Sequence, residues 1–220
     1  MSNASDTYRT LGQAAEGEFR DRGSKFLAYV APILSVDEAM AFLEDIRKAH
    51  PKARHHCYAY RLGMDGNNFR ANDDGEPSGT AGRPILGQID SFDLTNVMAV
   101  VVRYFGGTLL GTSGLINAYK QSTALAFEQA EIIERTVEDL FTIAFDYGLM
   151  SRVMNGVNSL PVDMVEQRFN LTAELDIAIR QSLVEDTLRR LKAQIADVYL
   201  EQADEMETIP GCTITRIGTR

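Results

Sequence analysis

VMAVVVRYFGGTLLGTSGLINAY (residues 97–119) and DDGEPSGTAG (residues 73–82) are the segments that decide how this chain folds. Residues 97–102 are uninterruptedly apolar, which predicts a strand in the middle of a sheet with both faces covered. A glycine-rich loop follows, and helical spacing begins near Ser113. Glycine permits positive φ and close backbone approach, so a strand, a glycine-rich loop and a helix start together resemble an anion cradle.

Periodicity predicts three further elements on the N-terminal side of these segments. They are a strand at residues 24–33, a helix after capping-box spacing at residues 35–38, and a strand at residues 54–61. In the last of these strands His56 lies on one face, and His55 and Cys57 lie on the other. Residues 65–67 favour a turn at the tip of a hairpin.

The sequence after residue 135 predicts a second module of six elements. Strands are expected at residues 140–147, 162–169, 171–179 and 208–217, and helices at residues 149–157 and after a second capping box at residues 182–185. This β-α-β-β-α-β order is that of a ferredoxin-like unit. We therefore predict an α+β protein with two domains, residues 1–135 and residues 136–220.

The charge of the chain is acidic overall but unevenly distributed. A formal net charge of −9 counts against a broad nucleic-acid-binding surface, because such surfaces are usually basic. Residues 46–64, however, contain five Lys or Arg side chains, all three histidines and no acid, and residues 94–127 also contain no acid. If the two segments adjoin, they give the protein one face that attracts anions.

The sequence favours a cytoplasmic protein without a membrane span. It has no run of 18 apolar residues, and no signal peptide is recognised at its N-terminus. Cys57 and Cys212 fall in different predicted domains, which argues against a disulfide framework and favours a reducing compartment.

Three blocks of sequence resemble the signature of a known family: ARHHCYAYRLG (residues 53–63), NDDGEPSGTAGRPIL (residues 72–86) and VVVRYFGGTLLGTSGLINAY (residues 100–119). Together they are similar to the IMPACT family and its bacterial YigZ branch, over nearly the whole chain. The resemblance implies a first domain like the second domain of small-subunit ribosomal protein five and a ferredoxin-like second domain. This pairing is similar to domains IV and V of elongation factor G.

The same resemblance implies a role in translation. Eukaryotic relatives regulate it by interfering with the activation of an initiation-factor kinase, and for the bacterial members the resemblance implies binding of nucleic acid or ribosomes. Two positions depart from the family pattern. Many relatives have a lysine in the loop after the glycine pair and a basic residue before the closing Ala-Tyr, where this chain has Leu109 and Asn117. Each difference removes a phosphate contact.

An anion- or nucleic-acid-binding site is predicted where the glycine-rich loop, the helix start and the basic segments meet. Its candidate residues are Arg54, His56, Arg103, Tyr104, Gly106, Gly107, Gly111, Ser113, Gly114 and Lys120. Backbone amides and the helix start would face a phosphate. The alternative is that the glycines only allow a sharp turn from strand to helix. Arg103 interrupts an apolar strand and is expected to pair with a carboxylate such as Asp74 or Glu76.

The acidic loop of Asp73, Asp74 and Glu76 has two interpretations. Its carboxylates suit Mg²⁺, but turn chemistry, in which they accept backbone N–H bonds, is preferred. Zinc binding or thiol catalysis at residues 55–57 is disfavoured, because adjacent strand residues face opposite sides of a sheet. No metal, cofactor or catalytic residue is therefore predicted. Four aromatic residues either stack on bases or belong to the core: Tyr58, Tyr60, Tyr104 and Phe105.

The leading functional hypothesis is a non-enzymatic RNA- or ribosome-associated binding protein that regulates translation. A second is a nucleotide-binding small-molecule phosphotransferase, because GGTLLGTSG resembles a phosphate-cradling loop and Asp73 or Asp74 would serve as base or metal ligand. A third is a protein-interaction module, whose acidic second domain binds a basic partner such as a ribosomal protein. The sequence leaves the particular RNA or protein partner and the oligomeric state open.

Overall fold

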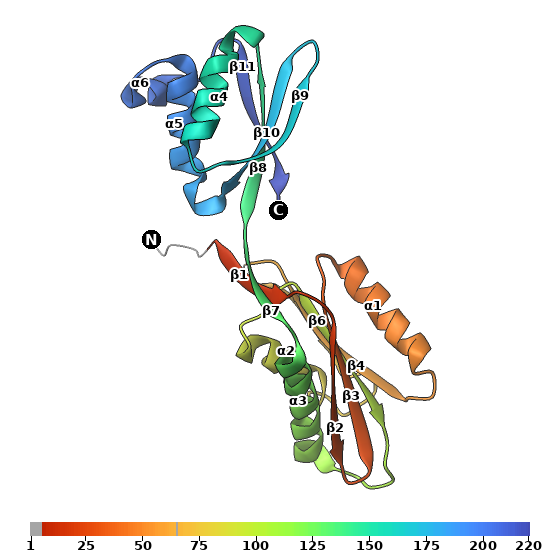
Figure 1. Cartoon of the computed structure of the whole chain (residues 1–220). Helices are drawn as coiled ribbons and strands as arrows, with labels where there is room; N and C mark the ends of the chain where they lie inside the picture. The colour runs from red at the N-terminus through yellow and green to blue at the C-terminus, as the bar shows by residue number, and fades with distance from the viewer. Residues whose placement is uncertain (1–5, 65) are drawn as a thin grey trace. The chain divides into compact units, whose positions relative to one another are not determined.

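The computed structural model describes residues 6–64 and 66–220, so Asp65 of the expected hairpin turn lies outside the described residues. The chain forms two compact units (Figure 1). One is Tyr8–Arg135, and the other contains residues 136–220 together with Asp6 and Thr7. Strands β1 (Thr7–Leu11) and β7 (Ile132–Thr136) form a small two-stranded sheet. No helix in the described part of the chain is long and apolar enough to cross a membrane.

A five-stranded antiparallel sheet forms the centre of the first unit, in the order β2-β3-β6-β4-β5. Its strands are β2 (Ala15–Asp21), β3 (Ser24–Pro32), β4 (His55–Leu62), β5 (Asn68–Asn72) and β6 (Val97–Tyr104). The prediction of a central, fully covered strand is confirmed, because β6 lies between β3 and β4 and its residues 97–103 are all buried.

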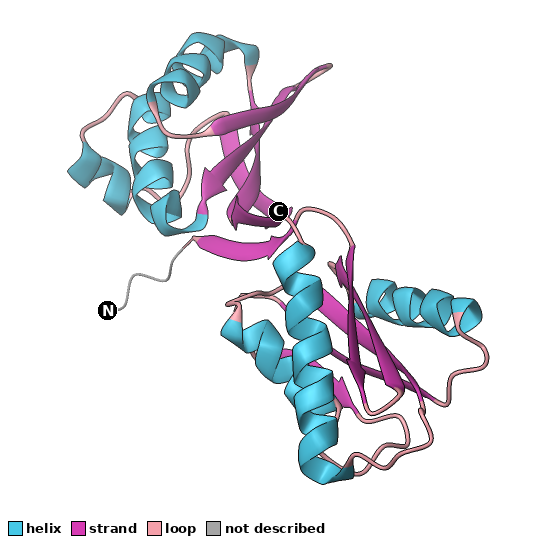
Figure 2. Ribbon diagram, turned by 60° about the horizontal axis from the view of Figure 1, so that its bottom comes forward, coloured by secondary structure: helices cyan, strands magenta, loops and turns pink. Residues whose placement is uncertain are grey.

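Helices cover both faces of this sheet (Figure 2). Helix α1 (Val36–Ala49) packs on one face, and α2 (Gly82–Ser91) and α3 (Gly111–Gln129) pack on the other. In β4, Tyr58 and Tyr60 contribute to the core under α1, whereas Cys57 and Ala59 contribute to the core under α2 and α3. Successive strand residues point to opposite faces, so one sheet supplies two hydrophobic layers.

Helix α1 begins where the sequence predicts. The Oγ atom of Ser35 accepts a hydrogen bond from the backbone N of Glu38 at 3.1 Å. The Oε2 atom of Glu38 accepts one from the backbone N of Leu34 at 2.7 Å, one residue further back than in the standard capping box. His50 is the C-cap, directly before Pro51.

The second unit has the predicted ferredoxin-like topology. Its sheet has the order β11-β8-β10-β9, and helices α4 (Met150–Ser159) and α5 (Val184–Ala196) cover one face (Figure 1). Its strands are β8 (Glu138–Phe145), β9 (Asp163–Phe169), β10 (Ala173–Arg180) and β11 (Cys212–Thr219). The prediction of an α+β protein built from two domains is therefore confirmed.

Some local predictions were wrong. The capping box at residues 182–185 does not form, because Leu183 is the N-cap of α5 and Ser182 instead hydrogen-bonds Asp6 through its backbone N and its hydroxyl. Helix α3 begins at Gly111, two residues before the expected Ser113. Helix α6 (Leu200–Glu205), helix α2 and strands β1, β2 and β7 were not predicted. The cap of α2 is the side chain of Asp73, which lies nine residues before Gly82, one of the residues whose amide it binds.

Candidate functional site

The candidate site lies at one end of the five-stranded sheet. Strand β4 begins there and β6 ends there, so that His55 pairs with Arg103 in the ladder, and Tyr104 pairs with Lys25 of β3. The loop between β5 and α2 reaches the same end, because Glu76 contacts Arg103. Segments far apart in the sequence therefore meet around the last residues of β6.

Arg103 is buried at this end and forms an ion pair inside the fold. Its Nη1 atom donates to Oε1 of Glu76 at 2.7 Å, and the hydroxyl of Tyr119 donates to the same oxygen at 2.8 Å. The expected pairing of Arg103 with a carboxylate of the acidic loop is confirmed. Its guanidinium carbon lies 5.4 Å from the ring centroid of Phe26 and 5.6 Å from that of Phe105. The Nε atom is buried and has no hydrogen-bond partner among the described residues.

Tyr119 and Cys57 lie beside this ion pair as two buried weak acids. The Sγ atom of Cys57 is 3.3 Å from the hydroxyl of Tyr119 and 3.0 Å from the carbonyl oxygen of Asp73. Burial raises the pKa of Cys57 and the pKa of Tyr119 far above their ordinary values. Both groups therefore stay protonated at neutral pH, and the thiol is a poor nucleophile.

Asp73 caps the start of helix α2. Its carboxylate oxygens accept hydrogen bonds from the backbone N atoms of Gly79, Ala81 and Gly82 at 2.8, 3.0 and 2.8 Å. Burial acts to raise the pKa of Asp73, but the three amides and Arg83 outweigh it and lower the pKa. The predicted turn chemistry is confirmed for this residue, which supplies negative charge where a helix start favours it.

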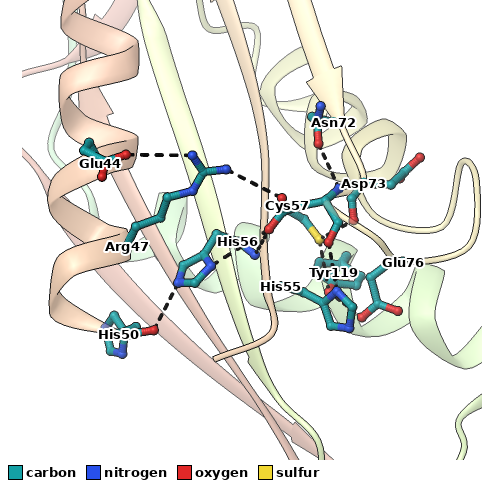
Figure 3. A network of polar contacts seen from close by, with 11 residues as sticks. Glu44, Arg47, His50, His55, His56, Cys57, Asn72, Asp73, Glu76 and Tyr119 are labelled. Carbon is teal, nitrogen blue, oxygen red and sulfur yellow. Dashed lines mark hydrogen bonds and ion pairs between the residues drawn. The ribbon is translucent and has the colours of Figure 1, made fainter. Parts of the chain in front are cut away.

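Asp74 connects the acidic loop to β4 and α1 through His56 and Arg47, both labelled in Figure 3. Its Oδ2 atom accepts a hydrogen bond from the backbone N of His56 at 2.7 Å, and its Oδ1 atom lies 3.5 Å from Nη2 of Arg47. The backbone N of Asp74 donates to Oδ1 of Asn72 at 2.8 Å. All three carboxylates of the acidic loop are thus bound to protein groups. The described residues contain no group of three or more His, Cys, Asp or Glu placed to hold a metal ion.

The two histidines of β4 face opposite sides of the sheet, as predicted. Nδ1 of His55 lies 2.9 Å from the carbonyl oxygen of Asp74, whereas Nε2 of His56 lies 3.2 Å from that of His50. Burial lowers the pKa of His56, against the opposing effects of the His50 carbonyl and of Asp74. His56 is therefore neutral at pH 7 and adds no positive charge. Tyr104 is also tied to the α1 side, because its hydroxyl lies 2.9 Å from Nδ1 of His50.

The glycine-rich loop after β6 is exposed, but close packing requires its first glycine. A Cβ atom on Gly106 would lie 1.9 Å from the carbonyl carbon of Gly23 in the β2–β3 turn. The backbone N of Gly106 also donates to Oγ of Ser24 at 3.1 Å. Gly107 and Gly111 have φ values of +88° and +71°, which non-glycine residues rarely adopt. The backbone alone therefore explains these three glycines.

Within residues 6–64 and 66–220, no side chain caps the start of helix α3. Its N-cap is Leu110, and the first turn contains no acidic residue. Ser113 is exposed in this turn, and Gly114 is partly buried. Amides at the start of a helix that lack a side-chain partner favour an anion.

Five exposed cations at or near this end of the sheet have no carboxylate within 4 Å in the described part of the chain. Two are candidates from the sequence, Arg54 and Lys120. The others are Arg22 in the β2–β3 turn, Lys52 before β4 and Arg83 in the first turn of α2. Lys52 belongs to the basic segment recognised in the sequence. Arg22 and Arg83 lie outside the two acid-free segments recognised in the sequence, and the fold brings them to this end.

The second unit contains a mostly apolar cavity of about 890 Å³ between α5, β11 and the segment that carries α6. Three of the charged groups around it bind protein groups of the same unit. Arg189 donates to the two carboxylate oxygens of Asp204 at 2.7 and 2.6 Å, and Lys192 donates to the carbonyl oxygen of Met206. None of the site residues predicted from the sequence lines this cavity.

Carboxylates of β9 and β10 surround one cation in the second unit. The guanidinium of Arg168 hydrogen-bonds Glu166 at 2.8 Å, Glu174 at 3.1 Å and Asp176 at 2.7 and 2.9 Å. The bond to Arg168 holds the pKa of Asp176 below its usual range. These acidic residues are therefore ordered by a contact within their own sheet.

Known proteins are similar to this chain in sequence and in fold. Residues 22–127 match the Impact N-terminal domain. An IMPACT family member of Haemophilus influenzae is 38% identical over 167 residues, which are 74% of this chain and 80% of that protein. The IMPACT family member YigZ of Escherichia coli is 34% identical over 176 residues, 79% of this chain and 84% of that protein. A crystal structure of a hypothetical protein matches with a TM-score of 0.67 and 28% identity, over 96% of this chain and 97% of that one.

The fold and these similarities define a two-domain α+β protein with an Impact N-terminal domain followed by a ferredoxin-like domain. The chain belongs to the IMPACT family. Membership confirms the resemblance of the three sequence blocks, all of which contribute residues to the end of the sheet described above.

Proposed function

We propose that this chain is a non-enzymatic, cytoplasmic RNA- or ribosome-associated binding protein that acts in translation. The observation that carries the proposal is the group of five exposed cations, none with a carboxylate within 4 Å in the described structure, in a chain of net charge −9. A nucleic-acid backbone supplies the phosphates that such cations neutralise. Arg54 and Lys120 would contact phosphates directly, and the uncapped start of α3 would add backbone donors.

The other candidate side chains support the surface without contacting the ligand. Arg103 fixes the acidic loop through Glu76, with 7% of its side chain exposed. His56 is neutral and buried, and Tyr104 is bound to His50. We therefore assign phosphate contact to the exposed cations and to the backbone of the loop.

The family resemblance supports a role in translation, and the chain covers most of the length of two bacterial relatives. The phosphotransferase alternative is not favoured by the geometry of the acidic loop. Asp73 is engaged by three backbone amides, and Asp74 by the backbone N of His56 and by Arg47. Neither carboxylate is free to act as a base.

Binding of a fluorescent single-stranded RNA and of purified ribosomal subunits, each at two salt concentrations, tests the proposal. We expect saturable binding that weakens as salt rises. For single strands, the double variant Arg54→Gln with Lys120→Gln should weaken binding and reduce the salt slope by about 0.7 for each lost phosphate contact. The proposal is contradicted if neither the RNA nor the ribosomal subunits show saturable, salt-sensitive binding at low ionic strength.

Arg70 provides the matched control. It is exposed on β5 and has no carboxylate within 4 Å among the described residues, but it pairs with Tyr60, roughly 16 Å along the strand from His55. Arg70→Gln removes the same charge from the same unit and should leave affinity nearly unchanged. In the opposite direction, Leu109→Lys and Asn117→Lys place cations at two exposed positions and should tighten binding and steepen the salt slope.

A further inference from the structure

One aromatic side chain at the candidate site is exposed. Of the four aromatic residues that the sequence leaves open between core and base stacking, Tyr58 and Tyr60 are 4% and 5% exposed beneath α1. Tyr104 is hydrogen-bonded to His50. Phe105, which directly follows β6, is 56% exposed. The structure therefore divides the four residues into three that serve the fold and one ring that faces solvent.

Buried groups hold the ring of Phe105 from beneath. The guanidinium of Arg103 lies over two aromatic rings, 5.4 Å from the centroid of Phe26 and 5.6 Å from the centroid of Phe105. Phe26 is fully buried and meets Tyr119 edge to face at a centroid distance of 5.1 Å. Glu76 fixes Arg103 from the side. A cation against both rings thus gives the exposed ring a rigid support.

The surroundings of Phe105 leave it accessible and positively flanked. The next two residues, Gly106 and Gly107, carry no side chain, and both are exposed. Arg54 precedes the β4 residue that pairs with Arg103, so an unpaired cation stands at the same end of the sheet. A rigid aromatic ring beside cations is the arrangement by which proteins bind single-stranded nucleic acid.

We propose that the site binds single-stranded RNA and that an unpaired base stacks on the exposed face of Phe105. This inference rests on the proposed function and states which form of RNA the site takes. In an A-form duplex the base faces are covered by their neighbours, so a ring can stack only on a base that is free of the helix. Every base has such a face, and binding is therefore tolerant of sequence.

Two probes test the stacking contact, a labelled single-stranded RNA of mixed sequence and the blunt duplex of the same sequence. Phe105→Leu keeps an apolar side chain but removes the aromatic ring. It should weaken single-strand binding roughly 5- to 150-fold, as expected for loss of one stacked base, and leave duplex affinity and the salt slope unchanged. Lys120→Gln should weaken the binding of both the single strand and the duplex, and it should reduce the salt slope.

A spectroscopic variant reports the contact directly. The chain contains no tryptophan, so Phe105→Trp introduces a single indole at the site. We expect saturable quenching of its fluorescence by the single strand and little change with the duplex. A second variant, Phe69→Trp at an exposed position on β5, provides the control, and its fluorescence should not be quenched. The urea midpoint of each variant verifies that it is folded.

The outcomes separate the stacking contact from the proposed function. If Phe105→Leu binds the single strand like the parent protein while Lys120→Gln loses affinity, stacking is overturned and the charged surface stands. A second result also overturns stacking. Nuclease treatment removes the accessible single strands from ribosomal subunits. If Phe105→Leu weakens binding to these treated subunits but does not weaken binding to RNA, Phe105 contacts a protein. If the parent protein binds none of these ligands, the proposed function fails and the stacking contact fails with it.

Discussion

The Nη1 atom of Arg103 lies 2.7 Å from Oε1 of Glu76, and the two side chains are only 7% and 3% exposed. This ion pair joins the central strand of the first unit to the loop that precedes α2. It explains how an arginine is accommodated at the end of an apolar strand, since its charge is neutralised within the fold. It also fixes the surface to which Phe105 and the glycine-rich loop belong.

Loss of one partner of this buried pair should strongly destabilise the first unit. Glu76→Gln leaves the Arg103 charge uncompensated and should cost about 3–5 kcal/mol of unfolding free energy. The double variant Glu76→Leu with Arg103→Met removes both charges and should recover much of this loss. Urea unfolding measures both. Asp45→Asn, which breaks an exposed pair with Lys48, should cost under about 1 kcal/mol. Equal losses for Glu76→Gln and Asp45→Asn would refute the structural role of the buried pair.

Removal of the α2 cap should destabilise the protein in a pH-dependent way. Asp73→Ala deletes the acceptor of three backbone amides and should cost about 1–2 kcal/mol at pH 7. The pKa of Asp73 is lower in the folded protein than in the unfolded chain, where it is near 3.9. The Asp73 carboxylate therefore stabilises the fold fully above the unfolded pKa, and this stabilisation is lost as the pH falls through the folded pKa. The difference between Asp73→Ala and the parent in urea unfolding should therefore shrink below about pH 4. A constant difference across this range would argue against the ionised cap.

The loss of stability caused by replacing a glycine with alanine should depend on what the new Cβ atom meets and on the backbone φ at that position. Gly106→Ala places a Cβ atom 1.9 Å from the backbone of Gly23 and should be severely destabilising. At Gly107 a Cβ atom meets nothing, but the φ of +88° should still cost about 1–3 kcal/mol. Gly87→Ala, inside α2 and also in open space, should stabilise by up to about 1 kcal/mol. Thermal unfolding gives the order, and a Gly106→Ala protein as stable as the parent contradicts the observed packing.

His56 should make stability fall at mildly acidic pH. Its folded-state pKa is lowered by burial, so the unfolded chain takes up the proton first. The stabilisation of the fold by neutral His56 is complete above the pKa of the unfolded chain, near 6.5, and is lost as the pH decreases toward the pKa of His56 in the folded protein. Asp74, Arg47 and His50 face the same ring and are unchanged in His56→Gln. We expect this variant to show a smaller loss of stability between pH 7.5 and 5.5, measured by urea unfolding. An unaltered pH profile would remove His56 as the cause.

Both cysteines should be unreactive in the folded protein. Burial raises the pKa of Cys57 above its ordinary value and raises that of Cys212 to about 11, so neither presents a thiolate near pH 8. Alkylation followed by intact-mass measurement should give no adduct in buffer and two adducts in urea. Rapid labelling of one thiol in buffer would show that its site opens.

Local periodicity was sufficient for most of the architecture. The apolar run in β6, the alternation in β3, β4 and β8 and the cap of α1 each depend on residues close in sequence. Helix α2 depends instead on a carboxylate that reaches over a loop to its first amides. At α5, the serine that resembles a cap binds Asp6, 176 positions away. Helix α2 was missed and the cap of α5 was mispredicted, because the deciding partner is distant in the chain.

The sequence by itself determined the two-domain order, the central buried strand and the residue types gathered at the end of the first sheet, because these follow from side-chain spacing and composition. Only the tertiary structure decided what each of those residues does. It buried Arg103 against Glu76, left Phe105 facing solvent, and brought Arg22 and Arg83 to the end of the sheet where Arg54 lies. Exposure and ion pairing depend on neighbours contributed by other elements, and chain folding alone brings those neighbours together.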